Sequence, residues 1–589
     1  MATITIDRQL NGVTPFELFG RTYTWTGSNG NLDRIGAYVE PGADTYDATY
    51  SLSGNMRIRS FELWYYDSVA DTPVGGSRTT ITDGGSAGNR RIDFLRIADG
   101  TNIITLANTV VEAMTAFFEL PSTQTTVTLG AARTGFINFG MGDTTINAGS
   151  GRIIGITLGT GKDVVNGGAG EIEFIRTGDG NDRFTAGTGR VTAVDTGSGN
   201  DTVIVGAGGR VGSVNTGDGN DTVQLSGNAL IESLRAYGNA AVTLRGDSRI
   251  EQAHLTGQDV RVTIQNDARI FQLKTGEGTN RITTGDGYFE SYFNFNGTNI
   301  VTLGAGGAGQ LTFAGSAGTQ TITGNGFISS LQVFDSARAV VTLNAGADYV
   351  RTGDANDRVT TTGDAFVGII RTQGGNDTVT LGAGGAQLVN LGNGDDLLRV
   401  AAMAPDRAIV IQGGGGTDTV DFGRIRQSVT VDLSNLGGFQ NIGAPGGTLI
   451  GVPGVIGYMA FSSIENLIGT NRADTLTGRE TANRLEGGGG NDVLIGGAGN
   501  DTLLGGKGND RLTGGADADV FQFARRDGTD RITDFELGLD QIAIAGVSRL
   551  GQITFSDVAA GARLVANGTT IIVEGLTAAE MRDADNFLF

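Results

Sequence analysis

Aspartate and glycine recur in this sequence at spacings that could bind a metal ion. From residue 469 onward, an aspartate or asparagine falls every nine residues, with glycines before it and an apolar side chain two residues after it. Copies of the pattern Gly-Gly-x-Gly-x-Asp-x-apolar-x begin at Gly487, Gly496 and Gly505. Calcium prefers carboxylate and carbonyl oxygens, and glycine allows the positive φ that turns carbonyls inward. The block therefore predicts a series of calcium-binding turns.

The predicted ligands in this block are the aspartates and the turn glycines. They are Asp474, Gly487, Gly488, Gly490, Asp492, Gly496, Gly497, Gly499, Asp501, Gly505, Gly506, Gly508, Asp510 and Asp519. Two nonapeptides would complete one coil of a parallel β-roll, with calcium held between successive turns by carbonyls and flanking carboxylates. Residues 18 apart would then share an edge: Asp474, Asp492 and Asp510 on one, and Asn483, Asp501 and Asp519 on the other. We expect Asn483 to weaken its site, and Asp517, in place of a turn glycine, to leave the last turn half-formed.

A second ladder of aspartates, with a period of about 19 or 20 residues, fills the middle of the chain. Its members are Asp143, Asp163, Asp182, Asp201 and Asp221, followed after a gap by Asp357, Asp377, Asp396 and Asp418. In the gap the same register holds residues that bind calcium poorly or not at all: Ala240, Val260, Asn280, Asn299, Gln320 and Ala339. The apolar residue two positions later persists: Val223, Val242, Val262, Ile282, Val301, Ile322, Val341 and Val359. The pattern predicts a continuous β-solenoid whose apolar core runs through every coil, while the metal-binding aspartates are missing from the coils in the gap.

The long-period ladder has two interpretations. Plain glycine turns at 206–209, 304–307 and 382–385 predict that each coil has one aspartate turn and one turn without acidic residues. The aspartates could bind calcium, or they could only accept hydrogen bonds within their own turns. Both interpretations place them at one edge of the solenoid.

Composition agrees with a metal-binding repeat array and excludes other classes of protein. The chain has 589 residues, of which 99 are glycine, and its hydrophobic fraction of 39% is enough for a packed core. The net charge of −21 would repel phosphate backbones, which argues against nucleic-acid binding. The absence of cysteine excludes disulfides and zinc–thiolate sites. No apolar stretch is long enough to predict a membrane span, and the N-terminus is not a usual cleavable signal peptide.

The sequence offers little for catalysis. A lone histidine, His254, cannot form a zinc site or a catalytic triad by itself, and the zinc-protease helix motif is absent. Paired carboxylates could act on a polysaccharide, as in β-helix lyases and epimerases, but the turns already account for the aspartates. We therefore predict that the protein is not an enzyme, with a β-helix polysaccharide-modifying enzyme as an alternative.

The repeats and their flanking segments resemble the repeats-in-toxin (RTX) family of calcium-binding proteins exported by type I secretion. The similar segments are the approach to the repeats at 416–422, 429–433 and 464–478, the closing segment at 530–540, and the final residues 585–589. The last of these resembles an uncleaved C-terminal export signal. The resemblance implies a Gram-negative host and a chain that folds outside the cell, where millimolar calcium fills weak sites and supplies folding energy.

We predict an all-β protein, a right-handed parallel β-solenoid and β-roll preceded by a small β-rich domain. The predicted parts are a β-rich N-terminal domain (1–95), a solenoid (96–425), an irregular insertion (426–468), the nonapeptide β-roll (469–540), and a C-terminal cap with the secretion signal (541–589). Alternating apolar and polar residues at 57–64 predict antiparallel strands in the first part. Its aromatic residues, Trp25 and Trp64 among them, would form either a binding or assembly head or that domain's own core.

The predicted function is that of a secreted calcium-binding structural protein of the cell surface or extracellular matrix. It could self-assemble into sheets or filaments like an S-layer subunit, or stay monomeric like an adhesin. The predicted partners are calcium, the type I secretion machinery, further copies of the chain and a cell-surface polysaccharide.

Overall fold

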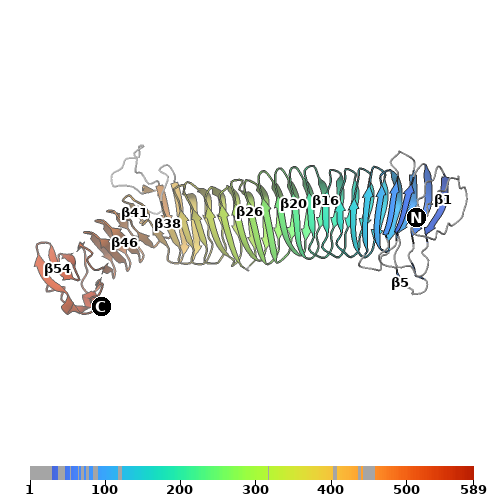
Figure 1. Ribbon diagram of the computed structural model, residues 1–589. Coiled ribbons are helices and arrows are strands. Elements are labelled where there is room, and N and C mark those ends of the chain that lie inside the picture. The colour runs from blue at the N-terminus through green and yellow to red at the C-terminus, as the bar shows by residue number, and fades with distance from the viewer. Residues whose placement is uncertain are drawn as a thin grey trace. The chain divides into compact units, whose positions relative to one another are not determined.

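The computed structural model is built from short β-strands stacked in coils (Figure 1). It describes residues 30–589 except 38–46, 53–54, 64–65, 68–71, 74–77, 84–89, 98, 117–122, 316–317, 402–407, 435–439 and 442–457. The chain divides into two compact units, Met1–Gly297 and Thr298–Phe589. In the described part of both, the only helices are the 3-10 turns Leu550–Gln552 and Ala584–Asn586. No helix among the described residues is long and apolar enough to cross a membrane.

The first unit consists of two parallel sheets, to each of which successive coils add one strand. One sheet contains β1 (Gly30–Ala37), β3 (Met56–Leu63), β7 (Arg90–Ile97), β9 (Thr109–Ala116), β11 (Thr134–Phe139), β13 (Ile153–Thr157), β15 (Ile172–Arg176), β17 (Arg190–Asp195), β19 (Arg210–Asn215), β21 (Leu230–Ala236), β23 (Arg249–Leu255), β25 (Arg269–Thr275) and β27 (Tyr288–Phe295). The other contains β2 (Asp47–Leu52), β6 (Arg78–Asp83), β8 (Thr101–Leu106), β10 (Gln124–Leu129), β12 (Asp143–Asn147), β14 (Val164–Asn166), β16 (Arg183–Ala186), β18 (Thr202–Val205), β20 (Asn220–Leu225), β22 (Asn239–Leu244), β24 (Asp259–Ile264) and β26 (Thr279–Thr284). A small antiparallel pair, β4 (Tyr66–Asp67) and β5 (Thr72–Pro73), lies outside these sheets.

The second unit begins with the same arrangement. One sheet contains β29 (Ala308–Ala314), β31 (Ile328–Val333), β33 (Gly346–Arg351), β35 (Phe366–Arg371), β37 (Ala386–Asn393), β39 (Ala408–Gly415) and β43 (Tyr458–Ser462), with β42 (Gln440–Asn441) antiparallel to β43. The facing sheet contains β28 (Thr298–Leu303), β30 (Thr319–Gly324), β32 (Arg338–Leu343), β34 (Arg358–Thr361), β36 (Thr378–Leu381), β38 (Leu397–Val400), β40 (Thr419–Asp421), β44 (Asn466–Ile468), β46 (Arg484–Gly489), β48 (Thr502–Lys507), β50 (Val520–Phe523), β52 (Gln541–Ile544) and β56 (Phe587–Leu588).

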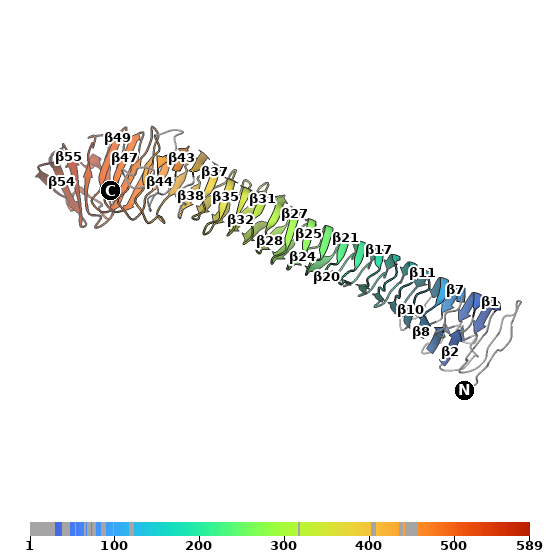
Figure 2. The same cartoon turned by 90° about the horizontal axis from the view of Figure 1, so that it is seen from above.

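In the nonapeptide roll, a third sheet faces the strands from β44 to β52 (Figure 2). Its parallel strands are β41 (Thr430–Asp432), β45 (Thr475–Thr477), β47 (Val493–Ala498), β49 (Arg511–Ala516), β51 (Thr529–Ile532) and β55 (Thr569–Glu574). The antiparallel strands β54 (Gly561–Ala566) and β53 (Thr554–Val558) complete it at the C-terminal end. The predicted all-β parallel solenoid and roll is therefore confirmed.

The predicted apolar ladder forms the core of both units. In the first unit Val223, Val242, Val262 and Ile282 stand in register on neighbouring strands. In the second unit Val301, Ile322, Val341 and Val359 do the same. All eight are at most 1% exposed. Each such burial stabilises the fold by about 1.5–3 kcal/mol, so the core ladder can hold coils that carry no acidic residue.

The expectation of antiparallel strands at 57–64 is wrong. Strand β3 pairs in parallel with β1 and with β7, and β2 pairs in parallel with β6. The parallel ladders thus reach back past residue 96, where the solenoid was expected to begin. Alternation of apolar and polar residues identifies the buried face of a strand, but it carries no information on the direction of its partner. Trp25 and Trp64 lie outside the described residues.

The segment 426–468, expected to be irregular, also contributes to the sheets. Strand β41 pairs with β45, β43 with β39, and β44 with β46, all in parallel. These strands are short, and the residues between them break the nine-residue period, which is why the sequence pattern did not reveal them. The remainder of the segment lies largely outside the described residues.

Candidate metal sites

The aspartates of the nonapeptide roll stack in two ladders, as the 18-residue spacing predicts. At one edge the backbone N–H of Asp474 donates to Oδ1 of Asp492 at 2.7 Å, and that of Asp492 to Oδ1 of Asp510 at 2.8 Å. At the other edge the N–H of Asn483 donates to Oδ1 of Asp501 at 2.7 Å, and that of Asp501 to Oδ1 of Asp519 at 2.9 Å. One carboxylate oxygen of each aspartate thus holds the preceding coil in place.

The second oxygen of these carboxylates is buried without a hydrogen-bond partner. This holds for Oδ2 of Asp492, Asp501, Asp510 and Asp519, and each of these residues is at most 2% exposed. A buried carboxylate oxygen without a donor or a cation carries a large desolvation cost. The ladder therefore places a row of oxygens where a cation or a proton is required.

The turn glycines leave space beside these oxygens. A Cβ built on Gly487 would lie within 2.5 Å of both Asp492 Oδ2 and the carbonyl oxygen of Gly505, one coil further on. A Cβ on Gly496 would lie within 2.5 Å of Asp501 Oδ2 and the carbonyl oxygen of Gly514. Carboxylate and carbonyl oxygens from adjacent coils therefore converge on a space that only glycine leaves open.

Burial raises the pKa of these carboxyl groups. It raises the pKa of Asp492 to about 7, with a further contribution from the charges of Asp510 and Asp474. Burial likewise raises the pKa of Asp501 to about 7 and that of Asp510 to about 6. Near neutral pH these carboxyl groups are therefore partly protonated. A bound divalent cation would replace the proton, because its charge neutralises the carboxylates directly.

The donor set fits calcium. All of the converging atoms are oxygens, which a hard cation prefers. Within the described part of the chain, no three His, Cys, Asp or Glu side chains are grouped closely enough to hold a metal ion, so backbone carbonyls would have to supply most ligands. The residues that would hold the ion are the ladder aspartates together with the carbonyls of the turn glycines.

The long-period ladder repeats the same hydrogen bond in each unit. In the first unit the N–H groups of Asp163, Asp182 and Asp201 each donate to Oδ1 of the next ladder aspartate, at 2.8, 2.8 and 3.0 Å, and the last acceptor is Asp221. In the second unit those of Asp357, Asp377 and Asp396 do the same at 2.7, 2.7 and 3.1 Å, ending on Asp418. Strand register places Ala240 and Val260, and later Gln320 and Ala339, at the same position. The strand pairing and hydrogen bonds thus follow the predicted register from Asp163 to Asp221 and from Asp357 to Asp418.

Asp143 is the exception among the predicted ligands. Thr144, one residue later, donates its backbone N–H to Oδ1 of Asp163 at 2.7 Å and occupies the ladder position. Asp143 is exposed and accepts a hydrogen bond from the N–H of Lys162 at 2.8 Å. Its placement in the ladder is wrong, because the coils before Asp163 shift the register by one residue. In the preceding coils Thr125 pairs with Asn102, and Thr144 pairs with Thr125.

The ladders contain three acidic residues that the repeat pattern missed. Glu465 follows Asp418, whose N–H donates to Oε2 of Glu465 at 2.9 Å, and the register then passes from Glu465 to Asn483. Asp530 and Asp540 end the two edges and accept hydrogen bonds from the N–H groups of Asp510 (3.0 Å) and Asp519 (2.9 Å). Their spacings of 20 and 21 residues from those partners, against 18 within the roll, are the signal that could have found them.

Three further residues of the roll differ from the consensus. Oδ2 of Asp474 accepts the N–H of Thr470 at 2.6 Å, so both of its oxygens have protein donors. Oδ1 of Asn483 accepts the N–H of Arg479 at 2.7 Å. Asp517 adopts a left-handed φ of 79°, as a glycine would, and its carboxylate accepts the N–H of Gly499 at 3.1 Å. The last turn is therefore fully formed, and the expectation that Asp517 would leave it half-formed is wrong.

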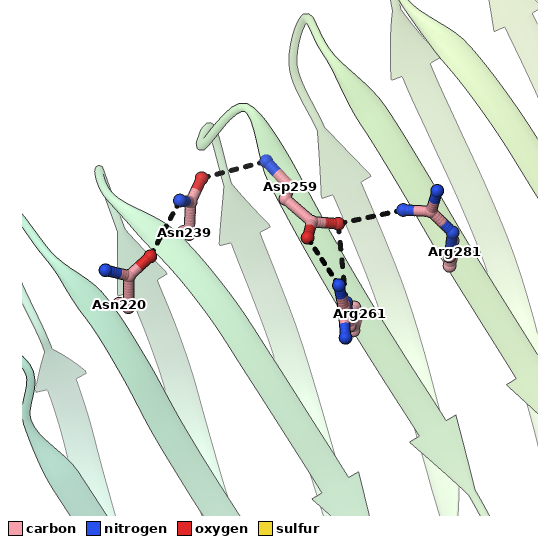
Figure 3. Close-up of polar contacts among 5 residues, drawn as sticks. All are labelled: Asn220, Asn239, Asp259, Arg261 and Arg281. Atoms are coloured by element: carbon pink, nitrogen blue, oxygen red, sulfur yellow. Dashed lines mark hydrogen bonds and ion pairs between the residues drawn. The ribbon is translucent and has the colours of Figure 1, made fainter.

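In the stretch without ladder aspartates, hydrogen bonds to side-chain oxygens outside the core link the coils (Figure 3). Nδ2 of Asn239 donates to Oδ1 of Asn220, and the N–H of Asp259 donates to Oδ1 of Asn239, both at 2.8 Å. The Asp259 carboxylate accepts hydrogen bonds from Arg261 at 2.8 Å and Arg281 at 3.0 Å, and the hydrogen bond from Arg261 lowers its pKa most strongly. Arginines neutralise the acidic group here. His254 is exposed on β23.

Comparison with known proteins identifies the repeats. The family described as the RTX calcium-binding nonapeptide repeat (4 copies) matches residues 468–503 and 495–522. Among solved structures, the chain is similar to the AlgE6R3 subunit of the Azotobacter vinelandii mannuronan C5-epimerase, with 35% identity over 21% of this chain and 81% of that one, at a TM-score of 0.18. It is also similar to the extracellular lipase LipA from Serratia marcescens, with 16% identity over 43% of this chain and 45% of that one, at a TM-score of 0.17. No curated protein matches the chain.

Proposed function

Because residues 468–522 are RTX calcium-binding nonapeptide repeats, we propose that the protein is a secreted structural protein of the cell surface whose roll folds when it binds calcium. RTX repeats are typical of secreted proteins, and calcium sites of extracellular modules have Kd values of about 10⁻⁴–10⁻³ M. In the low calcium of a cytosol such sites would be empty, so folding would follow export.

The observation that carries this proposal is the row of buried carboxylate oxygens beside glycine turns. Oδ2 of Asp492, Asp501, Asp510 and Asp519 has no protein donor, and folding the roll without a cation leaves these oxygens desolvated. Calcium that binds the folded roll and not the unfolded chain stabilises the roll, by about 2.7 kcal/mol for a site at a hundred times its Kd. Several such sites in one roll would make folding depend steeply on calcium.

A structural rather than catalytic role is supported by how the acidic residues are used. The ladder aspartates accept backbone hydrogen bonds from the preceding coil, which fixes them within the scaffold. Such carboxylates are poorly placed to exchange protons with a substrate, since a general acid or base must reach the reacting atom.

Self-assembly on calcium binding is the form of this role that we favour. Among the exposed apolar side chains of the described residues, Leu537, Leu539, Leu588 and Phe589 lie in the C-terminal segment and are between 43% and 53% exposed. Exposed apolar groups of this kind support association with another protein surface, and a second copy of the chain is the partner we propose. A monomeric adhesin is the alternative, and it needs the same calcium-dependent roll without association.

Calcium titration of the purified full chain tests the proposal. Circular dichroism should report a coil-to-β transition at sub-millimolar to millimolar calcium, and light scattering should report growth of the particles in the same range. Folding without growth would favour the monomeric adhesin over the assembling protein. If neither calcium nor a chelator changes the spectrum, the proposed function is wrong.

A further inference from the structure

We call the residue five positions before a ladder residue the cradle position; in the roll, the glycine at this position lies beside the ladder carboxylate. At seven ladder positions of the roll and its entry the cradle position is glycine: Gly413, Gly469, Gly478, Gly487, Gly496, Gly505 and Gly514 precede Asp418, Asp474, Asn483, Asp492, Asp501, Asp510 and Asp519. Before the other three ladder acids, Glu465, Asp530 and Asp540, it is Ala460, Arg525 and Phe535. In the long-period ladder it is threonine or leucine: Leu158, Thr177, Thr196, Thr216, Thr352, Thr372 and Leu391 precede Asp163, Asp182, Asp201, Asp221, Asp357, Asp377 and Asp396. The two kinds of coil therefore differ at the cradle position.

The cradle glycines are required for space and not for backbone conformation. The glycines with positive φ in the roll are their neighbours, among them Gly488 (97°) and Gly497 (120°), while Gly487 and Gly496 have no left-handed φ. A Cβ on either would collide with the ladder carboxylate and a carbonyl oxygen of the next coil. A side chain at this position would fill the space in which those oxygens converge.

In the threonine coils the side chain does fill this space. Thr177, Thr196, Thr352 and Thr372 are fully buried. The hydroxyl of Thr177 donates to the carbonyl oxygen of Thr196, the cradle residue of the next coil, at 3.0 Å. Thr352 donates to the carbonyl of Thr372 at 3.3 Å, and Thr372 to that of Leu391 at 2.5 Å. The carbonyl oxygen that corresponds to that of Gly505 in the roll here accepts a hydrogen bond from a threonine hydroxyl.

In two of the coils without ladder acids, the cradle residue and the ladder residue have the same polarity. Leu255 and Val260 are both buried and apolar, whereas Thr275 precedes Asn280 and is buried with it. Where leucine precedes an aspartate, as at Leu158 and Leu391, the side chain is at most 3% exposed and occupies the position that glycine leaves open in the roll. Oδ2 of the ladder aspartates is buried without a protein partner in these coils as it is in the roll. Here, however, a threonine or leucine side chain stands at the cradle position, where the glycines of the roll leave a space for an ion.

We propose that calcium binds only the glycine coils, from Asp418 onward, and that threonine and leucine side chains take its place in the coils of Asp163–Asp221 and Asp357–Asp396. The chain then joins a solenoid that is folded with or without calcium to a roll that requires it. This proposal rests on the proposed calcium binding by the roll and assigns the ion to particular coils.

Hydrogen exchange of the full chain, with calcium or with a chelator, tests this division. In chelator, peptides from 484–523 should lose protection, while peptides from 172–225 and 346–381 should keep it. Loss of protection in all three regions would overturn the division and leave the proposed function standing. If 484–523 stays protected in chelator, the roll itself does not need calcium, and both proposals fail.

Matched substitutions test the same point by bound calcium per chain. Asp501→Asn and Asp201→Asn both keep an oxygen that can accept the backbone N–H of the preceding coil, which Oδ1 accepts at 2.7 and 2.8 Å, so neither should unfold its coil. We expect Asp501→Asn to lose bound calcium and Asp201→Asn to retain the full amount. Gly496→Thr should also lose calcium, because it introduces the side chain found in the solenoid. Loss of calcium in Asp201→Asn, or full retention in Gly496→Thr, would overturn the proposal.

Discussion

The backbone N–H of Asp492 donates a hydrogen bond at 2.8 Å to Oδ1 of Asp510, which lies one coil further along the chain. The other oxygen of Asp510 is buried without a protein partner. Each carboxylate of this kind therefore has two separable roles, one in holding the coils together and one in meeting a cation. A substitution that keeps the Oδ1 hydrogen bond and removes the negative charge should separate the two roles.

Asp510→Ala should impair the roll more than Asp510→Asn. Alanine leaves the buried N–H of Asp492 without its acceptor, which costs about 1–3 kcal/mol, whereas asparagine keeps an acceptor and loses only the charge. The calcium midpoint of folding, measured by circular dichroism, should rise in both variants and rise further for alanine. Equal midpoints would contradict a structural role for the Oδ1 hydrogen bond.

Magnesium should not replace calcium in folding the roll. Magnesium demands near-octahedral geometry and gives up its water reluctantly, while calcium accepts irregular sets of carbonyl and carboxylate oxygens. The far-ultraviolet spectrum of the chain in millimolar magnesium should match its spectrum in chelator. Full folding in magnesium alone would show that the turns lack the size selectivity expected of carbonyl-lined sites.

In chelator, the solenoid should become less stable as pH rises from about 5 to 8. Burial raises the pKa of Asp377 to about 8 from an ordinary value of 3.8, helped by the charges of Asp357 and Asp396. Between these values the folded chain holds a proton that the unfolded chain releases, so stability is greatest at low pH and is lost as pH rises through the folded pKa.

Thermal melts in chelator across this range measure the effect. Asp377→Asn is the matched control, because it keeps an acceptor for the N–H of Asp357, which Oδ1 accepts at 2.7 Å, and cannot ionise. The variant should show a smaller decline in melting temperature with pH. A wild-type melting temperature that rises between pH 5 and 8 would contradict the assignment of buried, protonated carboxyls.

Ile322→Ala should destabilise its own region without altering calcium binding. Ile322 is fully buried between Val301 and Val341 in the core ladder, and removing such a side chain costs about 2–5 kcal/mol. Because each coil of a solenoid contacts only its neighbours, faster hydrogen exchange should be confined to the adjacent coils. An unchanged exchange pattern there, or reduced calcium per chain, would contradict this account.

Much of the acidic and apolar ladders could be predicted from spacing alone. A coil that stacks on its neighbours must return to the same position after a fixed number of residues, so residues such as Asp492 and Asp510 reveal the register without a structure. The prediction worked even where the acid is replaced, since Val260 occupies the ladder position and Val262 the core position. It failed where the period drifted, at Asp143, Asp530 and Asp540.

Other features could not be read from the pattern. The parallel partners of β3 depend on strands far along the chain, and alternation alone gives no direction. The role of Thr196 was not visible because its hydroxyl acts on Thr216 of the next coil, at 3.3 Å, rather than on a neighbour in sequence. The family resemblance placed Glu465 in the approach to the roll, but the fold alone inserts it between Asp418 and Asn483.

The sequence by itself determined that the chain is a solenoid of stacked coils with acidic turns, and that its nonapeptides bind calcium. Both conclusions follow from which residues recur along the chain and at what spacing. Only the tertiary structure decided which carboxylates have space for an ion beside them. That space depends on side chains and carbonyls brought together from successive coils: at Gly496 it is open, and at Thr196 it is filled. Whether an aspartate can bind a metal is therefore set by the residue packed against it, five positions earlier in the chain.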